Sequence, residues 1–110
     1  MLMLASMSVL AASTSGSAVP FSLFQEVWTK CVVAEAGIYA ETSETADVIA
    51  TVAEAKCEQW ADKVRESWLK YAKKMSPTAI DQGLAQIRAS NRAKALEAVL
   101  DWRLRFRTNG

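Results

Sequence analysis

Two cysteines, Cys31 and Cys57, constrain the fold of this 110-residue chain more than any other feature. They lie at nearly equal distances on either side of Glu41-Thr42-Ser43-Glu44, a polar stretch of the kind that favours helix caps and turns. If the flanking segments are helices joined there, an antiparallel hairpin brings the two cysteines opposite each other. The sequence therefore predicts a Cys31–Cys57 disulfide between two helices. A redox or metal role is the alternative.

The same hairpin register predicts partners for the large apolar side chains. The expected pairs are Trp28 against Trp60, Phe24 against Val64, and Ile38 near Ile49. One register thus accounts for the cysteines and the apolar residues together.

The first helix is predicted to begin at Ser22, whose hydroxyl can cap Gln25 in a capping box. Its apolar residues recur at spacings of three and four and form a single stripe. The stripe comprises Phe24, Val27, Trp28, Cys31, Ala34 and Ile38.

The second helix is predicted to open near Ser43 and to continue unbroken to Met75. Its stripe comprises Ala46, Ile49, Ala53, Cys57, Trp60, Val64, Trp68, Tyr71 and Met75. A helix of about 32 residues spans roughly 48 Å, whereas the first helix would span roughly 28 Å. The far end of the second helix therefore needs cover from a third.

The third helix is predicted to begin at Pro77 with Ser76 as its cap. A tight reversal there sets Leu84 opposite Trp68. Ile80, Leu84 and Ile87 share one face, whereas the later apolar residues fall on nearly the opposite face: Leu96, Val99, Leu100 and Leu104. The pattern indicates either a break near Ser90-Asn91 or an unbroken helix with an apolar face that needs a partner. The predicted fold is all-α, a disulfide-stapled antiparallel helical hairpin extended to a three- or four-helix bundle.

The leading segment, residues 1–18, contains no charged side chain. An apolar run is followed by small residues, and Gly16-Ser17-Ala18 fits a signal-peptidase site, as in a secretory signal peptide. No Lys or Arg precedes the run, so either the signal is weak or the natural start lies upstream of Met1. Polar residues from Ser13 to Ser17 interrupt the run, which disfavours a stable membrane span. We predict a cleaved signal peptide over residues 1–18, a single helical domain over residues 19–110, and a periplasmic or secreted protein, in keeping with an even pair of cysteines.

The net charge of +1 conceals an asymmetry. Residues 1–62 carry two basic and eight acidic side chains, whereas residues 63–110 carry eleven basic and four acidic ones. Such a split indicates either a nucleic-acid or membrane contact on the basic side, or attraction between the two parts within the fold or between molecules.

The sequence offers little for catalysis. It has no His, which removes the commonest general base and neutral metal ligand. Its cysteines form neither a C-x-x-C redox motif nor a zinc-ligand pair, and no glycine-rich phosphate loop occurs. Glu54, Glu58 and Asp62 recur every four residues, for which a solvated helix face is a better explanation than an acid/base pair or a cation site. We predict no enzyme, and no catalytic, cofactor-binding or metal-binding residue.

The C-terminal sequence Trp102-Arg103-Leu104-Arg105-Phe106-Arg107 alternates apolar with basic residues and is a candidate binding surface. Arginines with interleaved aromatics can bind nucleic acid or an anionic membrane surface. The alternative is a docked terminal helix whose solvated arginines suit its C-terminal dipole.

The segment from Phe24 to Tyr71 resembles small exported helical proteins of bacteria. The matching parts are Trp28-Thr29-Lys30-Cys31, the turn at Thr42-Ser43-Glu44, and the Ala-rich run that reaches Cys57. Such proteins are largely of unassigned function, so the resemblance implies export and a disulfide and adds no activity. A fainter similarity is to small periplasmic acid-stress chaperones, whose cysteines are further apart.

From these features we expect an exported helical protein that acts by binding a protein partner, or a second copy of itself, through the residues around Trp102, Leu104 and Phe106. The alternative is a cytosolic binder of nucleic acid or anionic membranes that uses its basic second half. A periplasmic chaperone-like stress protein is the third candidate.

Overall fold

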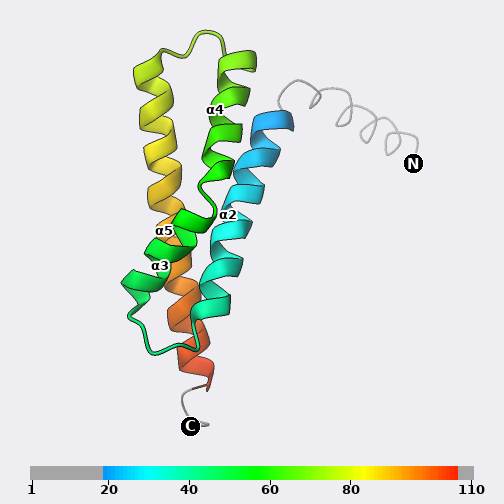
Figure 1. The fold of residues 1–110 in the computed structure, drawn as a ribbon. Coiled ribbons are helices and arrows are strands. Elements are labelled where there is room, and N and C mark those ends of the chain that lie inside the picture. The colour runs from blue at the N-terminus through cyan, green and yellow to red at the C-terminus, as the bar shows by residue number, and fades with distance from the viewer. Residues whose placement is uncertain (1–18, 107–110) are drawn as a thin grey trace, which may run out of the picture.

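The computed structural model describes residues 19–106, which form four packed α-helices (Figure 1). These are α2 (Val19–Tyr39), α3 (Ala46–Lys56), α4 (Gln59–Tyr71) and α5 (Pro77–Phe106). Helices α2 and α5 run in one direction, and α3 and α4 return in the other (Figure 1). The predicted all-α bundle is confirmed, while the predicted signal peptide lies outside the described residues.

The predicted disulfide is present between Cys31 on α2 and Cys57 at the end of α3, with Cα atoms 5.9 Å apart. The aromatic register of the hairpin differs from the prediction. The ring of Trp60 lies against Phe24, with centroids 6.2 Å apart, and Trp28 lies under the guanidinium of Arg88 instead. The predicted pairing of Trp28 with Trp60 is therefore wrong.

The second predicted helix is in fact two helices, and the break between them explains the change of register. At Cys57 the backbone N–H donates to the carbonyl of Glu54, three residues back, rather than to the fourth residue back. Beyond this tightened turn α4 takes its own direction beside α2, while α3 packs across α5 (Figure 1). The cap of α3 is Thr45, whose hydroxyl accepts the N–H of Val48, two residues after the predicted opening near Ser43.

Helix α2 buries a stripe that the sequence pattern only partly predicted. Its buried residues Trp28, Val32 and Ala36 recur every four positions, and buried Ala40 just beyond the helix continues the spacing. Ile38 is 60% exposed and does not pair with buried Ile49. Since α2 contacts α5 on one flank and α3 and α4 on the other, its buried face is centred between them. The helix also begins upstream of Ser22, which is therefore not its cap.

Helix α5 starts as predicted, because the hydroxyl of Ser76 accepts the N–H of Ala79. It is unbroken, so of the two alternatives for the region near Ser90-Asn91 the continuous helix with apolar residues on two faces is the one observed. The buried stripe continues through Asn91 and Ala95 to Val99. Asn91 is polar and Ala95 is small, so the apolar pattern does not reveal this part of the stripe. The Thr29 hydroxyl donates to the side-chain oxygen of Asn91 at 2.6 Å.

The end of α4 is covered by α5 through a close contact at Gly83. A Cβ placed on Gly83 would lie 2.8 Å from the ring of Trp68, closer than van der Waals contact allows. The absence of a side chain there lets the ring of Trp68 pack directly on α5, one residue from the predicted partner, Leu84. Within residues 19–106, no helix combines the length and apolarity that crossing a bilayer requires.

Candidate protein-binding surface

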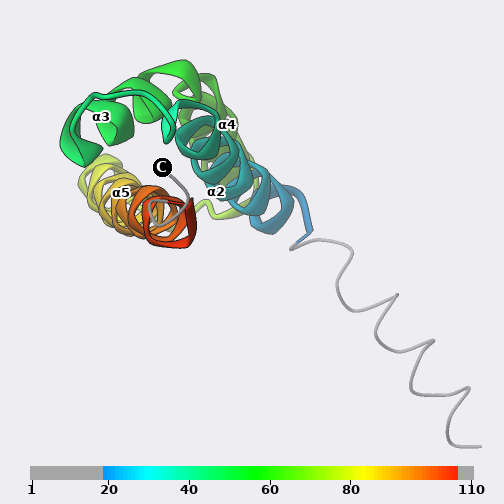
Figure 2. The same cartoon turned by 90° about the horizontal axis from the view of Figure 1, so that it is seen from below.

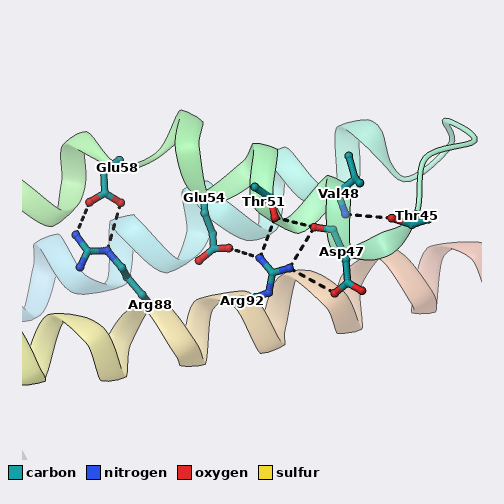
Figure 3. A network of polar contacts seen from close by, with 8 residues as sticks. All are labelled: Thr45, Asp47, Val48, Thr51, Glu54, Glu58, Arg88 and Arg92. Atoms are coloured by element: carbon teal, nitrogen blue, oxygen red, sulfur yellow. Dashed lines mark hydrogen bonds and ion pairs between the residues drawn. The ribbon is translucent and has the colours of Figure 1, made fainter.

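Arginines of α5 pair with the acidic face of α3 and the α3–α4 junction (Figure 3). The Arg92 guanidinium donates to Glu54 at 2.6 Å, to the Thr51 hydroxyl at 3.2 Å and to the Asp47 carbonyl at 3.2 Å. The hydrogen bond to Glu54 is the main cause of the raised pKa of Arg92, since it favours the charged guanidinium.

A second pair in the same network joins Arg88 to both carboxylate oxygens of Glu58 (Figure 3). The spacing of Glu54, Glu58 and Asp62 predicted a solvated helix face. Only Asp62 is exposed in that way, because Glu54 and Glu58 pair with arginines of α5. The acidic first part and the basic second part of the chain attract each other within the fold, which was one of the two readings of the charge asymmetry.

Arg103 holds the loop between α2 and α3 onto the end of α5. Its guanidinium donates to three backbone carbonyls: Ala40 at 3.0 Å, Thr42 at 2.8 Å and Glu44 at 2.6 Å. Carbonyls at the end of a helix lack partners within it and need an external donor. Arg103 supplies that donor, so this member of the predicted binding surface is occupied inside the fold.

The other predicted arginines are placed differently. Arg105 is 71% exposed and contacts Asp101 of the same helix at 3.2 Å, an exposed pair of small energetic value. Arg107 lies outside the described residues. The alternating sequence thus contains one arginine that is built into the fold and one that faces solvent.

The apolar members of the stretch, together with Leu100, form a surface at the end of α5 in which only Trp102 is partly buried. We refer to Leu100, Trp102, Leu104 and Phe106 as the end surface. The rings of Trp102 and Phe106 lie 4.7 Å apart, and Leu100, Leu104 and Phe106 are 54%, 60% and 47% exposed. Exposed apolar side chains in contact with one another mark interaction sites more often than scattered ones do.

The end surface borders a groove between α5 and the start of the α2–α3 loop. The groove has a volume of about 670 Å³ and is lined by Ala40, Glu41, Thr42, Leu100, Trp102, Arg103, Leu104 and Phe106. The α2–α3 loop and the last turns of α5 lie at the same end of the bundle and face the viewer in Figure 2. The structure therefore brings the predicted apolar residues of this stretch together at one open groove.

The different placement of the two arginines predicts different effects of removing them. Arg103→Met is expected to lower the free energy of unfolding by about 1–3 kcal/mol, because three carbonyls lose a charged donor. Arg105→Met is expected to change it by less than about 0.5 kcal/mol, because the side chain is exposed. Urea unfolding of the two variants, monitored by circular dichroism, measures both. Equal losses would contradict the distinct roles assigned here.

Within the described part of the chain, no three His, Cys, Asp or Glu side chains are grouped as metal ligands would be. Comparisons with protein-family models, curated proteins and solved structures gave no match for this chain.

Proposed function

We propose that this chain is an exported, disulfide-stapled helical protein that acts by binding another protein through its end surface, without catalysis. The observation that carries the proposal is the groove beside the paired rings of Trp102 and Phe106, which is also lined by the exposed side chains of Leu100 and Leu104. Aromatic residues in such positions supply much of the affinity at protein interfaces.

Export is supported by the disulfide and by the composition of residues 1–18. A disulfide persists best in an oxidising compartment, and the Cys31–Cys57 bond joins two helices of the bundle. The uncharged leading segment has the apolar run and the small-residue site of a secretory signal.

Protein binding is better supported than nucleic-acid binding because several cations are already engaged. Arg88 and Arg92 are held by carboxylates of the fold, and Arg103 by backbone carbonyls. A nucleic-acid site needs cations free to contact phosphates, and these three are not free.

A photo-activated crosslinking residue at position 104 tests the proposal in the organism that encodes the chain. We expect a discrete adduct with a protein, and we expect the mass of the recovered chain to lack residues 1–18. The matched control is the same crosslinker at Leu69, which is also 60% exposed but lies on α4, away from the groove. The residue at position 69 is expected to give no discrete adduct.

The outcomes separate the two parts of the proposal. Absence of a protein adduct at position 104, or the same adduct at both positions, would remove the end surface as the binding site. A full-length mass would contradict export, and adducts with nucleic acid would favour the cytosolic alternative.

A further inference from the structure

We infer that the partner of the end surface is a second copy of this chain, joined by antiparallel packing of the two α5 ends; this rests on the proposed protein-binding function. The end of α5 carries apolar side chains that the bundle leaves exposed. Its buried stripe ends at Val99, whereas Leu100, Leu104 and Phe106 beyond it are about half exposed or more. The red end of α5 extends past the α2–α3 loop, so no other described helix covers it (Figure 1).

Leucines on the outer side of α5 have a self-complementary spacing. Leu100 and Leu104 are four residues apart and therefore share one face of the helix. In an antiparallel pair related by a two-fold axis, Leu100 of one copy lies against Leu104 of the other, and the contact is repeated by symmetry.

The charges beside these leucines favour the same pairing. Asp101 and Arg105 each follow one of the leucines, and both are exposed, at 58% and 71%. In the leucine register, Asp101 of one copy lies within about two residues, or roughly 3 Å along the axis, of Arg105 of the other. An arginine side chain spans that offset, and the two-fold axis keeps both residues on the same flank. Opposite charges therefore meet twice, against a single contact of like charge, because the two Asp101 carboxylates lie at the same offset from each other.

The small size of this surface sets the expected strength of the dimer. One helix end offers less than the roughly 800 Å² per partner of a standard stable interface. The dimer is therefore expected to be weak and to depend on concentration.

Sedimentation equilibrium of the protein purified from its own host tests the inference. From low micromolar to submillimolar concentration, the mass is expected to rise from one chain towards two. Leu104→Asp is expected to keep the protein monomeric, whereas Leu69→Asp, at an equally exposed position, is expected to leave dimerisation unchanged. Circular dichroism of both variants checks that the fold is intact.

A charge swap between copies provides the sharper test. Asp101→Arg leaves two cations on each copy, and Arg105→Asp leaves two anions, so each variant alone is expected to dimerise at least about tenfold more weakly. An equimolar mixture of the two is expected to recover the affinity, since opposite charges then meet across the interface. The ion pair between Asp101 and Arg105 of the same helix is lost in both variants, so it cannot produce that recovery.

The results also separate this inference from the proposed function. A protein that stays monomeric throughout, or a dimer unaffected by Leu104→Asp, would overturn the inference. A monomer that still forms an adduct at position 104 with a different protein would leave the proposed binding function intact and show that self-association is wrong.

Discussion

Replacing Cys31 and Cys57 together with alanine is expected to lower the free energy of unfolding by about 3.5 kcal/mol. The disulfide closes a loop whose ends are 26 residues apart, and the crosslink removes conformational entropy from the unfolded chain. A domain of this size has a stability of about 5–15 kcal/mol, so the bond supplies a large share of it. Urea unfolding of the wild type and the double variant measures the difference.

Reduction of the wild-type protein provides the matched control. Dithiothreitol should lower the urea midpoint of the wild type towards that of the double variant, and should leave the variant unchanged. If reduction and the double replacement both leave the midpoint where it was, the staple does not stabilise the bundle.

The parts of the fold that were predictable from sequence are those with a local or symmetric signal. The positions of Cys31 and Cys57 about a polar turn predicted the hairpin and its disulfide. Ser76 before Pro77 predicted the start of α5, because both residues act within a single turn. Trp102, Leu104 and Phe106 of the candidate binding surface line the groove, whereas its role in binding stays a prediction.

The mispredicted parts depend on contacts between distant segments. The stripe of apolar residues runs through Cys57 without interruption, and so it contains no sign of the turn that separates α3 from α4. Asn91 lies in the buried stripe of α5 although it is polar, and the Thr29 hydroxyl on α2 donates to its side-chain oxygen. A pattern of apolar residues alone therefore could not decide between a break and a continuous helix.

Arg103 illustrates the same limit for the candidate site. In sequence it is equivalent to Arg105, since both alternate with apolar residues. Only the fold brings the carbonyls of the α2–α3 loop, about 60 residues away in the chain, within reach of one of them. The topology of the fold thus determines that Arg103 and not Arg105 is structural. The composition of the stretch does not distinguish the two arginines.

Trp28→Ala is expected to lower the free energy of unfolding by about 3–5 kcal/mol, the usual range for truncating a large buried aromatic side chain. Trp28 is only 2% exposed, so the truncation leaves a cavity in the core. It also removes the ring beneath the guanidinium of Arg88, which pairs with Glu58. Urea unfolding at neutral pH, with the disulfide intact, measures the loss.

The same truncation at Trp60 is the control, because this ring is only partly buried and contacts Phe24 at the edge of the hairpin. Trp60→Ala is expected to cost clearly less than Trp28→Ala, since water can reach the space that the ring leaves. Where Trp28→Ala does not fold, Trp28→Phe retains an aromatic ring and should show a smaller but measurable loss. Equal losses at positions 28 and 60 would mean that the core is not centred on Trp28. The four-residue spacing of the buried stripe of α2 would then not define the packing of the bundle.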